Sequence, residues 1–232
     1  MKDRQSALDR LAELFERVRS GQPSASRADP NVGVAPTPEA THLIVGLGNP
    51  GRDYAHHRHN IGFLLIDRLA AQLGTEFRRL QAKAFVTDAR HADKRLILAK
   101  PQTYMNESGQ VVSTLLKFYK VPIENLIVIY DDMDLPFGAL RIRPKGGSSG
   151  QKGMRSIIER LGGLENFPRL RLGIGRPPGR MAAEDFLLQD FSSSERADLE
   201  PVLENGIQAL LILITEGLET AMNRYNSSPS AG

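Results

Sequence analysis

The stretch that decides the fold of this chain is His42-Leu43-Ile44-Val45-Gly46-Leu47-Gly48-Asn49-Pro50-Gly51, with Arg58-His59-Asn60 close behind it. An apolar run that enters a Gly/Asn/Pro turn predicts a buried strand followed by a loop. The polar triplet comes directly before the apolar period that begins at Ile61, where a helix should start. Strand, loop and helix in this order indicate an α/β fold with an amide and an imidazole at its mouth.

Apolar periodicity extends the alternation of strands and helices to the C-terminus. The entirely apolar run 126–130 predicts a strand buried on both faces, whereas 139–143 alternates and predicts a more exposed strand. Ser192 and Glu195 mark a helix start, and Pro201 is expected near that start or at a kink. Further strands are predicted at 43–45, 85–89, 95–99 and 169–174, and helices at 61–73, 108–120 and 154–161. Together they predict a single α/β domain, a twisted mixed β-sheet flanked by helices.

This domain is expected to span residues 42–226. Residues 1–20 predict an amphipathic helical extension, because apolar residues recur there at spacings of three and four. Residues 21–41 are rich in Pro, Gly and Ser and predict a flexible linker, and residues 227–232 predict a disordered tail.

Composition excludes several classes of function. The chain of 232 residues has no cysteine, which rules out disulfides and a thiol nucleophile and fits a cytoplasmic location. Its longest aliphatic run, Leu210–Ile214, is far shorter than the ~20 residues of a membrane span. The acidic N-terminal region, with Asp3 and Asp9, does not fit a secretory signal. We therefore expect a cytoplasmic protein with no membrane partner.

Positive charge is concentrated in one segment. The net charge is +3, but ten Lys and Arg residues and two Glu residues lie between Ala139 and Arg180, so this segment carries +8 and the remainder −5. Such a concentration is typical of a polyanion partner, and a solvated basic face is the alternative.

Gly46, Gly48 and Gly51 also form the pattern G-x-G-x-x-G. A dinucleotide site requires the third glycine to open a helix directly, with an acidic residue about 20 positions further on. Here Pro50 and a polar segment intervene before any helical period, and that acidic residue is missing. The pattern does not favour a dinucleotide site.

The histidines His56, His57 and His59 are clustered. A metal site would need a further ligand such as His91 or Asp131. Solvated surface histidines are the simpler interpretation of His56 and His57, whereas His59 lies at a predicted helix start facing the strand ends.

Three aspartates, Asp131, Asp132 and Asp134, follow the buried strand 126–130. Because ligands of α/β sheets gather at the carboxyl ends of strands, Asp131 is well placed to orient an imidazole. A Mg²⁺ site made by two aspartates is an alternative, and Asp134 is equally suited to a turn.

Two further segments carry polar groups. Asn106 lies between a strand and a helix, as a site amide or a turn residue. The glycine-rich loop 146–153 could cradle a phosphate with its N–H groups, but it lacks the Walker pattern because Lys152 is followed by Gly153.

Taken together, the motifs resemble the bacterial-type peptidyl-tRNA hydrolase family from about His42 to Asn226. The resemblance rests on Gly46–Gly51 with Tyr54, Arg58–Asn60, Pro101–Gly109, Tyr130–Pro136 and Arg169–Gly175, in this order along the chain. It implies a metal-free and cofactor-free hydrolysis of the ester that joins a peptide to the terminal ribose of tRNA, by a monomeric enzyme.

The resemblance also implies roles for residues. It makes His59 the general base and Asp131 the residue that orients it. The substrate-binding residues that it implies are Asn49, Tyr54, Asn60, Tyr104, Met105, Asn106 and Lys152. Those implied to contact tRNA phosphates are Arg141, Arg143, Lys145 and Arg171.

One departure stands out in the glycine-rich loop. The family usually has Gly-Gly-His-Asn-Gly, whereas this chain has Gln151 and Lys152 in place of the histidine and asparagine. Lysine keeps donors and loses the acceptor, so we expect a changed substrate contact rather than an inactive enzyme. A non-catalytic RNA-binding protein on the same scaffold is the alternative.

Overall fold

The structure, a computed structural model, describes residues 40–226 and contains a seven-stranded sheet. The predicted N-terminal helix, most of the predicted linker and the predicted tail lie outside the described residues, and Thr41 begins the first strand. The strands are β1 (Thr41–Gly46), β2 (Arg79–Gln81), β3 (Ala84–His91), β4 (Lys94–Pro101), β5 (Leu126–Asp132), β6 (Leu140–Arg143) and β7 (Arg169–Gly173).

The sheet is mixed, as predicted. Its order is β2-β3-β4-β1-β5-β7-β6. The central strands β4, β1, β5 and β7 are parallel, whereas β2 and β3 at one edge and β6 at the other are antiparallel to their neighbours. Strand β5 is buried along its whole length, which agrees with its apolar sequence.

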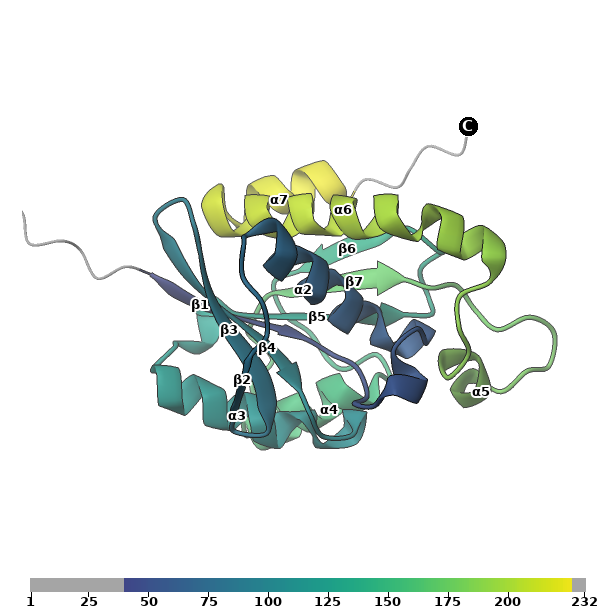
Figure 1. The fold of residues 1–232 in the computed structure, drawn as a ribbon, viewed down its shortest axis with the longest axis horizontal. Helices are drawn as coiled ribbons and strands as arrows, with labels where there is room; N and C mark the ends of the chain where they lie inside the picture. Colours follow the sequence, from purple (N-terminus) through teal and green to yellow (C-terminus); the bar gives the residue numbers. More distant parts are fainter. Residues whose placement is uncertain (1–39, 227–232) are drawn as a thin grey trace, which may run out of the picture. The chain divides into compact units, whose positions relative to one another are not determined.

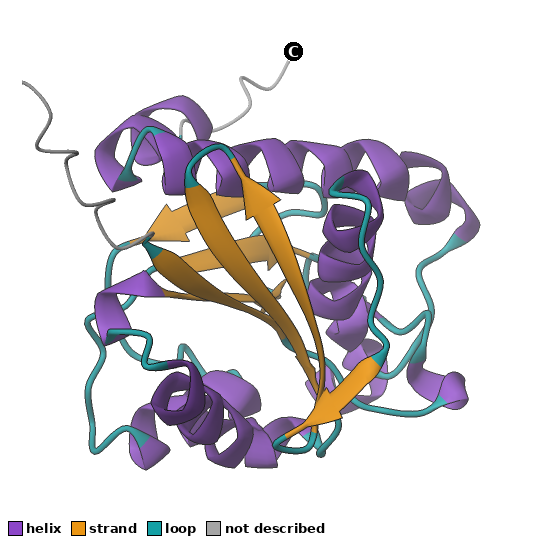
Figure 2. Ribbon diagram, turned by 60° about the vertical axis from the view of Figure 1, so that its left-hand side comes forward, coloured by secondary structure: helices purple, strands orange, loops and turns teal. Residues whose placement is uncertain are grey.

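Helices cover both faces of this sheet. In Figure 1, α2, α6 and α7 lie on one side of the strands and α3 and α4 on the other, and Figure 2 shows the twisted sheet between these two layers. The helices are α2 (Ile61–Gln72), α3 (Ser108–Tyr119), α4 (Lys152–Arg160), α5 (Ala183–Leu187), α6 (Ser193–Thr215) and α7 (Leu218–Tyr225). Short 3₁₀ turns that matter for the site are η2 (Arg58–Asn60) and η3 (Met105–Glu107).

Each face of the sheet has its own apolar core. One core joins Ile44, Leu98 and Ile129 to the buried sides of α2 and α6. The other joins Val45 and Val128 to α3 and α4. Alternate residues of β1 and β5 enter opposite cores, which fixes the register of the central strands.

Close packing of α2 on β1 explains Gly46, the first glycine of the G-x-G-x-x-G pattern, and Gly62 in the helix itself. A Cβ atom on Gly46 would lie 2.3 Å from the backbone oxygen of Gly62, and one on Gly62 would lie 2.6 Å from backbone atoms of Leu47 and Ile129. Helix α2 begins only at Ile61, after a loop and two 3₁₀ turns. The glycines therefore let a helix approach a strand, and no helix opens directly after Gly51.

The helices and strands expected from periodicity are confirmed, with small differences at their ends. The predicted capping box is present, because the Ser192 hydroxyl accepts from the N–H of Glu195 and the Glu195 carboxylate accepts from the N–H of Ser192. Helix α6 continues through Pro201. Strand β2 and helices α5 and α7 were not predicted, since each is too short to show a clear period. No helix within residues 40–226 is both long and apolar enough to cross a membrane.

Candidate active site

The candidate site lies where the chain changes direction across the sheet. From β1 the chain first builds β4 on one side and then β5 on the other, so a crevice opens at the carboxyl ends of β1 and β5. A cavity of ≈ 630 Å³ lies there. It is lined by Asn49, His59, Tyr104, Met105, Asn106, Tyr130, Asp131, Asp132, Met133, Asp134, Ser149, Gly150, Gln151, Lys152, Arg176, Pro177, Ala183, Glu184, Leu187 and Leu188.

His59 and Asp131 form a buried pair at the base of this cavity. The Nδ1 atom of His59 lies 2.9 Å from Oδ1 of Asp131, and the two side chains are 8% and 3% exposed. Burial disfavours the charged imidazole, but the charge and the hydrogen bond of Asp131 outweigh burial and raise the pKa of His59 above its ordinary value, while Lys152 lowers it. Because Nδ1 faces Asp131, Nε2 is the nitrogen left for a water molecule. Strand β5 includes Asp131, which the sequence placed just past the strand.

The side chain of Asn60 fixes the backbone of Asn49 by two hydrogen bonds. Its Oδ1 accepts from the N–H of Asn49 at 2.8 Å, and its Nδ2 donates to the Asn49 carbonyl at 2.9 Å. Asn49 in turn accepts from the N–H of Met105 through its own Oδ1, at 2.9 Å. This contact identifies the oxygen of the Asn49 amide, so its Nδ2 donor is the group turned to other partners.

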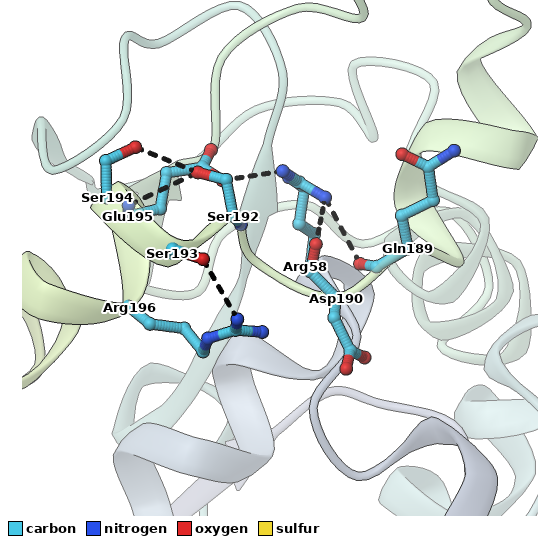
Figure 3. Close-up of polar contacts among 8 residues, drawn as sticks. All are labelled: Arg58, Gln189, Asp190, Ser192, Ser193, Ser194, Glu195 and Arg196. Carbon is cyan, nitrogen blue, oxygen red and sulfur yellow. Dashed lines mark hydrogen bonds and ion pairs between the residues drawn. The ribbon is translucent and has the colours of Figure 1, made fainter.

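Arg58 fixes the turn that carries His59. Its guanidinium donates to the carbonyls of Gln189 and Asp190 and lies 2.6 Å from the Glu195 carboxylate, as Figure 3 shows. The guanidinium carbon also lies 4.3 Å from the centre of the Phe186 ring. Arg58 is only 6% exposed, so these contacts replace its hydration and join η2 to the segment around α5.

The glycine-rich loop forms another wall of the cavity. Buried Arg169 anchors the start of this loop by donating to the carbonyls of Gly146 and Gly147. At its end, the Gln151 side chain caps α4 by accepting from the N–H of Met154 at 2.7 Å. Lys152 is exposed and forms an ion pair with Glu184 of α5 at 2.5 Å, which links the two sides of the cavity mouth.

The structure brings seven of the expected site residues together around the cavity. These are Asn49, His59, Tyr104, Met105, Asn106, Asp131 and Lys152. Two others lie behind it: Asn60 is buried against Asn49, and Tyr54 packs edge-on against His57. Neither is among the cavity-lining residues, so their expected contact with substrate stays a prediction.

The four expected phosphate-binding residues lie on β6, on the following loop and on β7. Arg143 and Lys145 are exposed, whereas Arg141 is half-buried. Arg171 pairs with Asp132 at 2.5 Å and its side chain is 15% exposed. Arg141 and Arg171 are direct neighbours across the two strands. These four residues, here called the basic stripe, lie on β6, on the loop after it and on the neighbouring strand β7, and the exposed members are the more available to a polyanion.

The alternative metal sites find no support in the arrangement of the histidines. His59 contacts Asp131, whereas His57 lies 3.9 Å from Asp190 and His56 is exposed. No group of three or more His, Asp and Glu side chains within residues 40–226 is arranged to hold a metal ion.

Sequence reasoning missed the wall formed by α5 and the segment before it. Glu184, Leu187 and Leu188 line the cavity, with Arg176 beside them. Their only signal was position, since the segment lies between the strand β7 and the capped helix α6 and has no period of its own. It reaches the site because Arg58 holds the end of this segment.

Comparison with known proteins agrees with this geometry. The family model described as peptidyl-tRNA hydrolase matches residues 43–231. Peptidyl-tRNA hydrolase of Chloroflexus aurantiacus is 52% identical over 185 residues, which are 79% of this chain and 98% of that protein. The chloroplastic peptidyl-tRNA hydrolase of Arabidopsis thaliana is 42% identical over 219 residues, 94% of this chain and 73% of that protein.

A solved structure leads to the same family. The crystal structure of peptidyl-tRNA hydrolase from Acinetobacter baumannii matches with a TM-score of 0.75 at 32% identity, and the match covers 82% of this chain and 96% of that chain. Fold, motif order and matched length therefore agree: this chain belongs to the peptidyl-tRNA hydrolase family.

Proposed function

We propose that this protein, a peptidyl-tRNA hydrolase by family, hydrolyses the ester between the peptide and the 3′-terminal ribose of peptidyl-tRNA, with His59 as the general base. The observation that carries the proposal is the buried His59–Asp131 pair, which faces a cavity large enough for the end of a substrate. The free tRNA and the peptide are the products, so the reaction recycles peptidyl-tRNA that has left the ribosome early.

The proposed reaction needs one water molecule and no other reactant. His59 Nε2 removes a proton from the water as its oxygen attacks the ester carbonyl carbon. The resulting tetrahedral intermediate expels the ribose oxygen, which receives the proton from the imidazolium. Asp131 keeps the proton of His59 on Nδ1 and stabilises the imidazolium. General base catalysis of this kind contributes about 10²- to 10⁴-fold.

Asn49 is the proposed donor for the peptide end of the ester. Its Oδ1 is occupied by the N–H of Met105, and no partner for its Nδ2 is found within residues 40–226. Met105 fixes the oxygen of this amide and Asn60 fixes the Asn49 backbone, and a neutral amide donor held in this way can stabilise the oxygen on which negative charge develops. Asn106, exposed on η3 at the same cavity, is placed to bind the substrate or the attacking water.

The exposed basic residues support tRNA as the partner. Arg143 and Lys145 continue the stripe that begins at Arg141 and Arg171, beside the glycine-rich loop. Phosphates of a tRNA whose 3′ end enters the cavity would meet positive charge there.

The test compares an N-acetyl-aminoacyl-tRNA with free aminoacyl-tRNA, in the presence of EDTA, for the wild type and the variants His59→Ala and Asp131→Asn. We expect release of the blocked amino acid only, a rate at least 10²-fold lower in His59→Ala, and a smaller loss in Asp131→Asn. Full activity of His59→Ala would contradict the proposed base, and inhibition by EDTA would contradict the metal-free mechanism. Tight binding of intact blocked tRNA by the wild type would instead support the RNA-binding alternative.

A further inference from the structure

Gln151 lies in the site but has no role in the reaction proposed above. It is 9% exposed and comes from the glycine-rich loop, at the residue before α4. Within residues 40–226, its side chain makes three polar contacts. Oε1 accepts from the N–H of Met154 at 2.7 Å, and Nε2 lies 3.2 Å from Oδ1 of Asp131 and 3.3 Å from Sδ of Met105.

The helix cap determines which way the amide points. A backbone N–H can bond only to an acceptor, so the atom that caps α4 must be the oxygen. The NH₂ group of Gln151 is therefore on the side of Asp131. The helix cap alone determines which end of the amide is oxygen and which is nitrogen.

The acceptor of this NH₂ group is the same carboxylate oxygen that faces the imidazole. Oδ1 of Asp131 lies 2.9 Å from His59 Nδ1 and 3.2 Å from Gln151 Nε2. With two donors on one oxygen, the carboxylate cannot rotate without losing both contacts. We propose that Gln151 is a positioning residue, which uses the α4 cap to aim its amide at Asp131 and so holds the Asp131 carboxylate toward His59.

This inference rests on the proposed function, because aiming Asp131 matters only if His59 is the base. It gives the departure at position 151 a chemical meaning. The family's usual histidine can carry a charge near neutral pH, whereas the amide of Gln151 donates a hydrogen bond at every pH.

Three substitutions separate the two contacts of Gln151. Gln151→Ser keeps a strong helix cap but is too short to reach Asp131. Gln151→His retains a ring N–H that can donate to Asp131, but histidine is a poor cap. Gln151→Met fills the space of the glutamine and removes both the cap and the donor.

The expected rates follow the donor and not the cap. We expect kcat to fall about tenfold in Gln151→Ser and Gln151→Met, with KM little changed, and to stay within about threefold of the wild type in Gln151→His. The melting temperature should fall in Gln151→His and Gln151→Met but not in Gln151→Ser. If kcat followed the melting temperature instead, Gln151 would be a helix cap only and the inference would be wrong.

A substrate-free measurement separates this inference from the proposed function. NMR titration of the His59 imidazole gives its pKa in the free protein. Asp131 raises the pKa of His59, and without the Gln151 donor its carboxylate is held toward His59 less firmly, so the pKa of His59 should fall in Gln151→Ser and Gln151→Met. The charged groups around the imidazole stay the same in both variants: Asp131, Lys152 with its partner Glu184, Asp132 with Arg171, and Arg58 with Glu195.

Failure of the positioning role and failure of the proposed general base would therefore give different results. An unchanged pKa of His59 together with an unchanged kcat in Gln151→Met would contradict the positioning role. An active His59→Ala variant would contradict the general base itself, whatever the titration shows.

Discussion

The charge of His59 depends on three opposing influences. Burial disfavours the imidazolium, Asp131 favours it strongly enough to raise the pKa of His59, and the charge of Lys152 opposes it. A general base must be neutral to accept a proton, so in the proposed mechanism this balance would set the lowest pH at which hydrolysis occurs. At the level of single residues, the proposed mechanism depends on one carboxylate oxygen of Asp131 and on the groups that contact it.

The first prediction concerns the pH dependence of the rate. Because the pKa of His59 is raised above 6.5, kcat/KM should increase with pH along a limb whose midpoint lies above 6.5. In Asp131→Asn the burial of His59 is no longer opposed, so the midpoint should move to lower pH. A wild-type midpoint below 6.5 would contradict the influence of Asp131.

The raised pKa of His59 also affects the stability of the folded protein, but it favours low pH, whereas the proposed base works at higher pH. A raised pKa stabilises the folded state below the unfolded value of about 6.5, and this contribution is lost as pH rises through the folded value. The condition that favours the folded protein is thus the one in which His59 is protonated and inactive as a base.

The second prediction concerns Lys152→Asn, which introduces the residue usual in the family. Loss of the positive charge should raise the pKa of His59 and move the acid limb of kcat/KM to higher pH. Because the Lys152–Glu184 pair is largely exposed, we expect little change in stability. Lys152→Arg keeps the charge and serves as the control. Identical profiles and substrate affinities in wild type and Lys152→Asn would show that this position does not matter.

At the scale of the elements, the connection between η2 and the α5 segment joins the turn that carries His59 to a wall of the cavity. Arg58 makes this connection through two carbonyls of the segment and through Glu195 at the start of α6 (Figure 3). The pKa of Glu195 is lowered: burial would raise it, but hydrogen bonds from Ser192 and the charge of Arg58 outweigh burial. A single side chain therefore links η2 to two neighbouring elements that lie more than 130 residues further along the chain.

The third prediction is that Arg58→Met destabilises the protein by about 3 kcal/mol, because it leaves two backbone carbonyls and a half-buried carboxylate without their partner and removes a buried side chain. The matched control is Arg68→Ala, which removes an exposed ion pair with Glu200 and should cost less than about 1 kcal/mol. Urea unfolding measures both. We also expect a lower kcat for Arg58→Met, since the wall with Leu187 loses its anchor. Equal losses in the two variants would contradict the anchoring role.

For the molecule as a whole, charge is distributed unevenly over a nearly neutral chain. Folding uses part of the basic segment internally: Arg169 is buried under the glycine-rich loop, and Arg171 pairs with Asp132. Arg143 and Lys145 stay exposed. The count of basic residues in the sequence therefore overstates the number that can neutralise phosphates.

The fourth prediction concerns the salt dependence of tRNA binding. Arg143→Ala and Lys145→Ala should each weaken binding and reduce the slope of log K against log salt by about 1. Arg68→Ala on α2 should leave the slope unchanged. The measurement is a filter-binding titration at several salt concentrations with uncharged tRNA. Slopes equal to that of the wild type in both variants would exclude these two residues as phosphate contacts.

The sequence by itself determined the α/β class, most of the elements and the family, because these depend on local information. Apolar period and capping residues give strands and helices, and five motifs in order give the family. The stretch around Gly46 also indicated where the site lies, since a strand that ends in a polar turn places that turn at the end of the sheet.

Only the tertiary structure decided which polar side chains act together. His59, Asp131 and Gln151 are far apart in the sequence, and their meeting depends on the order of strands β1 and β5 and on the cap of α4. The burial of Arg169 and the cavity wall at α5 also depend on the tertiary structure, since no apolar periodicity in the sequence predicts them. Contacts of this kind arise from packing between elements, and packing depends on the complete fold rather than on any one segment.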